Sequence, residues 1–287
     1  MYSRRRLNEE IDSIETIRSL TDIYQQISAI SILQVKNSVS RTRTFLAGVA
    51  LVYGNAKQSY IKNAQTLINK RKDISNLDFI RRNNKEVLVF VSANQTLYGD
   101  LISRVYKEFI EDLKVKKVDS VVIGKIGRFM MAREDLDSRV EYFDLADYKP
   151  EWTKIQEITD LISQYEKITV YYGEFLSIVN QIPTKSDISG GAVLGTLVKT
   201  VKDYFFEPTP VEIMKFFETQ VIANLFHQKI YEAQLARFAS RLITMNDASK
   251  NATEKLGDLN EDFLRLKKYV RNKKQLVTHS SRALWGM

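Results

Sequence analysis

The chain has 287 residues, of which 44% are hydrophobic and 27% charged, and its formal net charge is +8 at pH 7. This composition is typical of an ordered protein with a core, in one large domain or two. The absence of cysteine excludes disulfides and thiolate metal sites. The longest apolar run, residues 45–53, is far shorter than the ~20 residues that span a bilayer. The positive charge predicts an acidic partner, which leaves nucleic acid, anionic lipid and an acidic protein surface open.

Residues 1 to about 72 are predicted to form one long helix. Three arginines at positions 4–6 lead into a polar helix and not an apolar one, so no signal peptide is expected. Apolar residues then recur three or four positions apart, and no proline occurs before Pro150. The residues of this apolar stripe are Leu7, Ile11, Ile14, Ile17, Leu20, Tyr24, Ile27 and Ile30.

The middle of the chain alternates short β-type runs with helical spacing. The strand candidates are residues 87–91, 118–123, 140–143 and 168–172, and the helix candidates are residues 101–113 and 152–165. Alternation at these lengths favours βαβ units and a mostly parallel sheet. Residues 183–191 are predicted to form a polar loop, and residues 197–206 an edge strand.

Residues 211–287 contain no proline and only two glycines, Gly257 and Gly286. A continuous helix over this stretch would be about 110 Å long, whereas the mean helix has about 11–12 residues. Such a long apolar stripe needs a partner of similar length, and the N-terminal helix is the obvious candidate. The stripe consists of Leu235, Phe238, Leu242, Met245, Ala248, Ala252, Leu256, Leu259, Phe263, Leu266 and Val270.

The predicted fold class is therefore α+α/β. It is an antiparallel coiled coil of long N- and C-terminal helices with an inserted Rossmann-like α/β domain. The expected parts are residues 1–75 for the first helix, 76–206 for the inserted domain and 207–287 for the last helix. The predicted coiled-coil seam comprises Ile11, Ile14, Leu20, Ile27, Leu235, Phe238, Leu242, Met245, Leu256, Leu259, Phe263, Leu266 and Val270.

No stretch of the chain predicts catalysis. There is no phosphate-binding Walker loop, and the glycine-rich stretches at 124–127 and 190–195 do not fit a dinucleotide fingerprint, so we interpret these glycines as loop and turn residues. His227 and His279 are the only histidines, and neither has metal-ligand spacing, which favours surface or packing roles. We expect no catalytic residue, no cofactor and no metal bound directly by this chain.

The C-terminal end is strongly basic. Beyond Asp262 there is no acidic residue, and the cations are Arg265, Lys267, Lys268, Arg271, Lys273, Lys274 and Arg282. Such a run is most often a solvated helix face. The functional alternative is a surface that slides against acidic protein or docks on phosphate, where each exposed contact contributes about 0–1 kcal/mol. Tyr269 is the lone aromatic residue inside the run, which is thin support for stacking on nucleic acid.

Several segments, in order along nearly the whole chain, resemble the gamma subunit of F-type ATP synthases. Residues 204–210 (YFFEPTP) are similar to the family's Tyr-x-Phe/Tyr-Glu-Pro-x-Pro, and residues 240–252 (SRLITMNDASKNA) to its Ala-Arg-Met-x-Ala-Met-x-x-Ala-Thr-x-Asn-Ala. Residues 121–127 (VVIGKIG) resemble a family strand that ends in Ile-Gly-x-x-Gly. Residues 92–101 (SANQTLYGDL) replace half of the family's Ser-Asp-Lys/Arg-Gly-Leu-Cys-Gly-Gly-Leu signature, and residues 20–31 lack two family lysines.

The resemblance implies a non-catalytic central stalk of a rotary F-type ATPase or ATP synthase. The implied partners are a hexamer of alpha- and beta-type subunits, an epsilon- or delta-like foot subunit, and a membrane ring or a substitute base. ATP, ADP and Mg would be bound by the partner subunits, and no nucleic acid is expected. The basic residues implied to face the stator are Lys267, Lys268, Arg271, Lys273 and Lys274. The expected location is cytoplasmic, peripheral to the membrane through the complex.

Two alternatives stay open at this point. The shaft could belong to a specialised F-type-like ATPase that hydrolyses ATP to drive other machinery instead of ion-coupled synthesis. From another class, the chain could be a basic coiled-coil adaptor that binds acidic protein or nucleic acid. An α/β enzyme centred on the inserted domain ranks last, because no catalytic site is identified.

Overall fold

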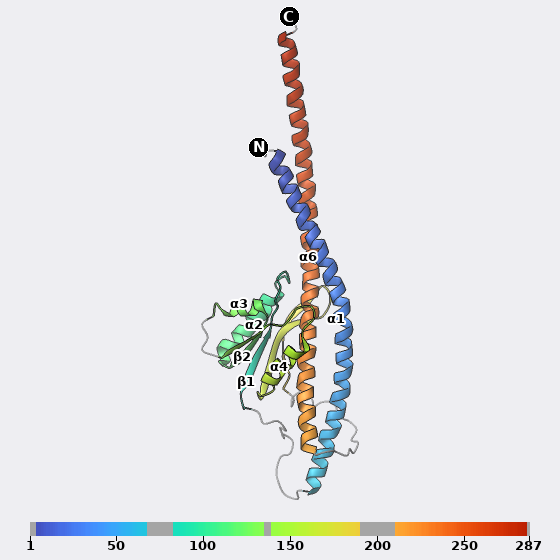
Figure 1. Cartoon of the computed structure of the whole chain (residues 1–287), viewed down its shortest axis with the longest axis vertical. Helices are drawn as coiled ribbons and strands as arrows, with labels where there is room; N and C mark the ends of the chain where they lie inside the picture. The colour runs from blue at the N-terminus through green and yellow to red at the C-terminus, as the bar shows by residue number, and fades with distance from the viewer. Residues whose placement is uncertain (1–3, 68–82, 135–138, 190–209, 286–287) are drawn as a thin grey trace. The chain divides into compact units, whose positions relative to one another are not determined.

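The computed structural model describes residues 4–67, 83–134, 139–189 and 210–285. A helix of 64 residues, α1 (Arg4–Leu67), begins the described chain, and one of 76 residues, α6 (Pro210–Trp285), ends it (Figure 1). The two long helices predicted from the apolar stripes are thus confirmed. The predicted domain boundaries at residues 75 and 206 fall outside the described residues.

The part of the chain that connects the long helices forms a five-stranded sheet in the order β3-β2-β1-β4-β5. Its elements in chain order are β1 (Glu86–Val91), α2 (Leu101–Lys116), β2 (Asp119–Ile123), α3 (Lys125–Met131), β3 (Val140–Phe143), α4 (Trp152–Ile162), β4 (Lys167–Phe175) and β5 (Gln181–Asp187). The first four strands pair in parallel, and β5 pairs with β4 in antiparallel register. The predicted βαβ organisation is confirmed.

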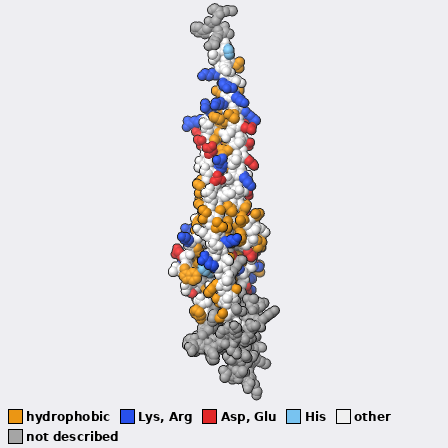
Figure 2. All heavy atoms as spheres, turned by 90° about the vertical axis from the view of Figure 1, so that its right-hand side faces the viewer, with side chains coloured by type: hydrophobic (Ala, Val, Ile, Leu, Met, Phe, Trp, Pro, Cys, Tyr) orange, Lys and Arg blue, Asp and Glu red, His pale blue; other side chains and the backbone are white. Residues whose placement is uncertain are grey.

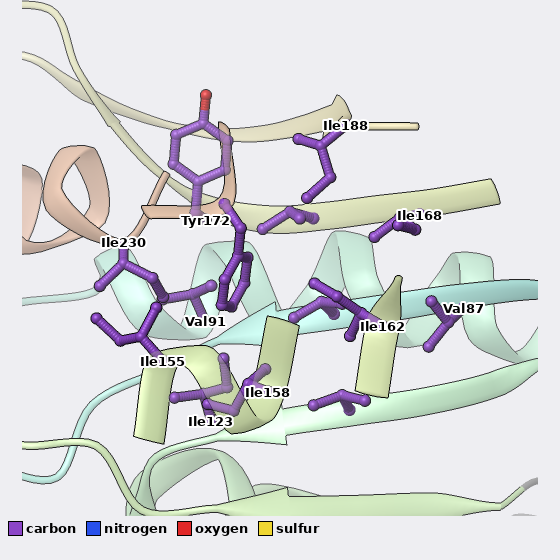
Figure 3. Close-up of a cluster of buried hydrophobic side chains, with 14 of the residues drawn as sticks. Val87, Val91, Ile123, Ile155, Ile158, Ile162, Ile168, Tyr172, Ile188 and Ile230 are labelled. Atoms are coloured by element: carbon purple, nitrogen blue, oxygen red, sulfur yellow. The ribbon is translucent and has the colours of Figure 1, made fainter. Parts of the chain in front are cut away.

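Helices cover both faces of this sheet, which explains why its central strands are buried throughout. One face packs on α2, where Phe109 stacks on Phe90 at 5.2 Å and meets the edge of Tyr171 at 5.5 Å between ring centroids. The other face forms a cluster with α4 and the first part of α6, in which Ile158 of α4 and Ile230 of α6 are buried (Figure 3). The first half of α6 is therefore part of the core of the inserted domain.

Two elements differ from the sequence-based prediction. Residues 183–187 belong to β5, where a polar loop was predicted. Because β5 is an edge strand with only β4 as neighbour, it tolerates Pro183 and polar side chains that a central strand would not. The short helix α3 was not predicted, and the predicted edge strand 197–206 lies outside the described residues.

Gly124 and Gly127, which we interpreted from the sequence as loop and turn residues, are required on steric grounds. Gly124 has a φ of +102°, and a Cβ there would lie 2.7 Å from the backbone oxygen of Ala93. A Cβ on Gly127 would lie 2.7 Å from a methyl carbon of Val122. The Gly-x-x-Gly spacing therefore lets α3 begin directly after β2 and pack closely on the sheet. The glycines of residues 190–195 lie outside the described part of the chain.

Contacts divide the chain into two compact units, and the division cuts through both long helices. One unit joins Met1–Ser28 with Arg241–Met287, and the other comprises Ala29–Ser240 with the sheet. We call them the helix-pair unit and the sheet unit. Across the ranges that the structure describes, no helix has the length and hydropathy that a bilayer span requires.

Candidate functional site

In the helix-pair unit, α1 and α6 run antiparallel. The guanidinium of Arg4 lies over the ring of Phe263 at 5.7 Å. Near the other end of the unit, the Ser249 hydroxyl donates a hydrogen bond to Asp22 at 2.6 Å. Low numbers on one helix thus match high numbers on the other. The predicted antiparallel pairing is confirmed by these contacts.

Burial along α1 in this unit recurs in steps of seven residues. Leu7, Thr21 and Ser28 are buried, and Ile14 is half-buried. A seven-residue repeat keeps one face of a helix turned toward its partner over several turns. Two of these buried positions carry small polar side chains, Thr21 and Ser28.

The residues of the predicted seam differ in their burial. Met245, Leu256 and Leu259 are buried, and Ile11, Ile14, Leu242, Phe263 and Leu266 are half-buried. Leu20, Ile27 and Val270 are instead exposed, at 50%, 38% and 54%. Leu20 and Ile27 precede the buried Thr21 and Ser28 by one residue, which turns them about 100° around the helix axis. Their assignment to the seam is therefore wrong for the isolated chain.

The other two predicted seam residues, Leu235 and Phe238, are buried in the sheet unit. Phe238 stacks on Tyr148, with ring centroids 5.2 Å apart. Tyr148 belongs to the segment that connects β3 to α4. At this position α6 packs on the inserted domain, a contact that the seam prediction did not include.

Helix α1 carries a row of exposed apolar side chains. Within the helix-pair unit this row consists of Ile17, Leu20, Ile23 and Ile27, which are each between 38% and 51% exposed. We call it the apolar row. Exposed rows of large aliphatic side chains are typical of surfaces that bind other proteins. The helix pair alone leaves the row uncovered.

A buried arginine lies within the helix pair. Arg241 is 1% exposed, and its guanidinium lies 5.6 Å from the ring centroid of Tyr24 on α1. A desolvated cation over an aromatic ring contributes about 2 kcal/mol. Arg241 is also the arginine of the 240–252 segment on which the family resemblance rests. The motif therefore has a structural role in joining the two helices.

The basic run lies toward the C-terminal end of α6 (Figure 2). Arg265 pairs with Glu261 and Asp262 at 3.4 and 3.6 Å. The residues predicted to face a stator, Lys267, Lys268, Arg271, Lys273 and Lys274, are all exposed. Acidic side chains gather just before this run and basic ones within it, so the helix-pair unit ends in a positively charged surface.

In the sheet unit, a buried polar network holds α6 to the loop that follows β1. The Asp147 carboxylate is buried and accepts hydrogen bonds from the backbone amides of Asn94, at 3.0 Å, and Gln95, at 2.7 Å. Arg237 of α6 is also buried, lies 3.7 Å from the Asp147 carboxylate, and donates to the Ser92 carbonyl. The negative charge of Asp147 and the positive charge of Arg237 therefore compensate each other in a buried site.

Two further residues of α6 complete this attachment. The Gln234 amide donates to the carbonyls of Asp147 and Tyr148. The Ser240 hydroxyl donates to the Tyr98 carbonyl at 2.7 Å. Positions 234, 237 and 240 lie on one side of the helix, so α6 is bonded to both ends of the loop 92–98. Movement of α6 in this unit must carry the loop with it.

Sequence reasoning missed this network. Asp147 and Arg237 are ninety positions apart in a chain rich in both charges, so neither stands out from its neighbours. The available signal was the segment 92–101, which aligns with the family signature. Its departures from that signature lie in the loop that contacts Arg237 and Ser240.

The histidines take up structural or exposed positions. His227 is half-buried between Trp152 and Tyr231, with ring centroids 4.7 and 4.5 Å away. Burial lowers the pKa of His227 below its usual value. His279 is exposed. Within the described ranges, no three His, Cys, Asp or Glu side chains are grouped so as to hold a metal ion.

Comparison with known proteins agrees with this geometry. The family model described as ATP synthase matches residues 3–268. The ATP synthase gamma chain of Roseiflexus castenholzii is 25% identical over 271 residues, which cover 90% of each chain. That of Stenotrophomonas maltophilia is 22% identical over 270 residues, which cover 90% of this chain and 91% of that protein.

Solved structures share the fold. The rotor of Euglena gracilis mitochondrial ATP synthase superposes with a TM-score of 0.59 at 11% identity, over 93% of this chain and 98% of that chain. A second structure of the same enzyme, described as OSCP/F1/c-ring, gives 0.61 at 11% identity, over 98% and 93%. At such identities the likeness shows the fold alone.

Long antiparallel terminal helices with an inserted, mostly parallel sheet are the fold that this chain shares with the rotor of Euglena gracilis mitochondrial ATP synthase. The match of the family model extends over nearly the whole chain. The chain belongs to the ATP synthase gamma family. The resemblance, the fold class and the central-stalk function expected from the sequence are confirmed.

Proposed function

We propose that this chain is the non-catalytic shaft that couples rotation to nucleotide turnover in a hexamer of alpha- and beta-type subunits. The observation that carries the proposal is the apolar row Ile17, Leu20, Ile23 and Ile27, which the helix pair leaves exposed. A sleeve of surrounding subunits would bury these side chains. ATP, ADP and Mg would be held by the partner subunits, and this chain would bind none directly.

Coupling follows from the reciprocity of binding free energies. If the nucleotide state of the hexamer favours one shaft angle, the shaft angle must favour one nucleotide state by the same free energy. An asymmetric shaft then drives the beta subunits through different conformations in turn. The chain needs no catalytic residue for this role, only a stiff and asymmetric surface.

We propose that Lys267, Lys268, Arg271, Lys273 and Lys274 face acidic surfaces of the stator. Exposed ion pairs contribute about 0–1 kcal/mol each, so they form and break easily as the shaft turns. Weak contacts of this kind suit a moving interface better than a permanent one. Raised salt would then weaken the shaft–stator contact more than the attachment of α6 to the sheet.

The partners at the other end are proposed by analogy. Solved structures that share the fold carry descriptions that name a central stalk with c-ring in Tetrahymena thermophila and OSCP/F1/c-ring in Euglena gracilis. For this chain we propose an epsilon- or delta-like foot subunit and either a membrane ring or a substitute base. The shaft would be cytoplasmic and peripheral to the membrane through the complex.

The proposal has two forms, which differ in the direction of ATP turnover. We propose an F-type complex coupled to an ion gradient as the first form, and a complex that hydrolyses ATP to drive other machinery as the second. A membrane ring that purifies with the complex would favour the first form. Its reproducible absence, with ATPase activity retained, would favour the second.

The test is affinity purification of the tagged chain from its own cell, with mass spectrometry and an ATPase assay on the eluate. We expect alpha- and beta-type subunits at less than one shaft per pair. Ile23→Asp should reduce their recovery, because the charge enters the apolar row. Val115→Asp is the matched control, since Val115 is also an exposed apolar residue, on α2 of the sheet unit. Recovery of the chain alone would contradict the proposal.

A further inference from the structure

The sheet unit contains a cavity that the stalk function does not use. Its volume is about 530 Å³, within the range of roughly 300–1,000 Å³ typical of small-molecule sites. It is bounded by the loop 96–99, by the first turn of α2 and by α3 with the residue Arg133 beyond it. It lies beside the carboxyl ends of the parallel strands β1 and β2, the edge at which sheets of this type bind ligands.

The lining is apolar with a positive rim. Ile102, Phe129 and Met130 supply apolar surface, and Lys125 and Arg133 supply charge. None of the described residues that line the cavity is acidic. The cavity therefore suits a molecule with an apolar body and one anionic group.

Among the residues that the structure describes, two acidic side chains that neighbour these cations leave the positive charge available. Asp144 lies 3.6 Å from Lys125, but both side chains are more than half exposed, so this pair is weak and easily replaced. Glu134, next to Arg133, is already bound to Lys114 at 2.7 Å. The guanidinium of Arg133 instead lies over the ring of Phe129, at 4.7 Å, where it faces the apolar lining.

The rim of the cavity carries backbone strain. Leu97 has a φ of +72°, a conformation that costs a residue with a branched side chain about 1–2 kcal/mol. It leaves Leu97 46% exposed, beside Phe129 at 63%. The strained loop is held on either side by Gln95, bonded to Asp147, and by Tyr98, bonded to Ser240. Strained backbone fixed in this way is characteristic of ligand sites.

From the cavity, its charge and the strained rim, we infer that the sheet unit binds a small amphipathic anion, such as a medium-chain carboxylate. The apolar body lies along Ile102, Phe129 and Met130, and the anionic group binds Lys125 and Arg133. The ligand touches the loop 96–99, which is bonded to α6, so its occupancy stiffens the attachment of the helix to the sheet. The inference does not depend on the proposed hexamer.

Binding is tested with the full chain and two dyes. The anionic dye 8-anilinonaphthalene-1-sulfonate should bind saturably, one molecule per chain, and dodecanoate should displace it. The neutral N-phenyl-1-naphthylamine should bind more weakly. No saturable binding of the anionic dye, or equal affinity for the neutral one, would overturn the inference.

Variants locate the site. Ser103 lines the cavity from the first turn of α2, so Ser103→Trp fills the cavity and should abolish binding of the anionic dye. Arg133→Gln should weaken it about tenfold, the equivalent of one charge-assisted hydrogen bond, and leave the neutral dye unaffected. Arg128→Gln is the control, because Arg128 lies on the neighbouring helix α3 but its guanidinium lies over the ring of Tyr142, at 5.1 Å. Circular dichroism checks that each variant is folded.

A binding constant that neither Ser103→Trp nor Arg133→Gln changes would place the dye elsewhere and overturn the inference. The same titration is repeated on the complex purified with its partners. Loss of binding on assembly would mean that a protein segment occupies the cavity, which also contradicts a small-molecule site. Retained binding, competed by dodecanoate, supports it.

Discussion

At the scale of single residues, the attachment of α6 depends on the buried pair Asp147 and Arg237. The Asp147 carboxylate serves two backbone amides as well as the guanidinium. A buried pair contributes little net stability when complete, but removal of one charge leaves the other uncompensated in a site without water. The network therefore makes the loop 92–98 sensitive to single substitutions.

Asp147→Asn is expected to lower the free energy of unfolding by about 3 kcal/mol, because Arg237 loses its counter-charge. Asp144→Asn is the control, since the Asp144 carboxylate is exposed and its loss is expected to cost less than about 1 kcal/mol. Urea denaturation of both variants measures the difference. Equal costs would show that the buried pair has no special role.

Substitution of alanine for glycine is expected to have opposite effects on stability at Gly124 and at Gly257. Gly124→Ala forces a Cβ into the backbone of Ala93 at a positive φ and is expected to destabilise the chain by about 1–3 kcal/mol. Gly257→Ala meets no atom within 4 Å inside a helix and is expected to stabilise it by about 0.5–1 kcal/mol. Denaturation curves that shift in the same direction would refute this account.

Because His227 is half-buried, the stability of the chain is expected to depend on pH. Its pKa in the folded chain is lower than the usual 6.5, because burial disfavours the imidazolium. The unfolded chain thus binds the proton more tightly, and stability is lost as pH falls from 6.5 toward the folded-state pKa. Denaturation between about pH 5 and pH 8 should show this loss in the parent and in His279→Gln. It should be absent in His227→Gln, and a loss that persists there would assign it to another group.

At the scale of elements, helix pairing depends on small residues as much as on large ones. Ser28 is fully buried in the helix-pair unit, whereas the neighbouring Ala29 is exposed. Ser28→Leu should overpack the seam and cost about 1–3 kcal/mol, while Ala29→Leu should be nearly neutral. Thermal unfolding compares the two variants. A tolerated Ser28→Leu would show that the seam is not close-packed there.

How well the sequence predicts each element depends on how many other elements pack against it. The buried strands β1, β2 and β4 were predicted because covering on both faces leaves an apolar run. The edge strand β5 was missed because one free edge permits Pro183 and polar residues. Apolar spacing predicted α1 as a helix but assigned Leu20 and Ile27 to its seam. Periodicity alone does not distinguish an apolar face that meets the partner helix from an apolar face that stays exposed.

The buried network lay beyond prediction for a different reason. Its members come from α6, from the loop after β1 and from the segment before α4, and only the tertiary fold brings them together. Gly124 and Gly127 were visible in the sequence. Only the structure shows why glycine is required at these positions: Gly124 has a positive φ, and Val122 approaches Gly127 closely.

At the scale of the whole molecule, α1 and α6 each run through both compact units. The sheet unit is hydrogen-bonded to α6 through Gln234, Arg237 and Ser240, and the helix-pair unit leaves the apolar row exposed. In the proposed function, the first feature would transmit force from a base and the second would act on a surrounding hexamer. The exposed basic run adds contacts that a turning surface can exchange.

The central claim is that this chain turns inside a hexamer whose nucleotide turnover depends on its angle. The most direct measurement immobilises the purified complex through its beta-type subunits, attaches a bead to the sheet unit of the shaft, and records the bead under ATP. We predict continuous rotation in one direction that stops when ATP is removed. Sustained hydrolysis of ATP with a bead that does not rotate would contradict the account.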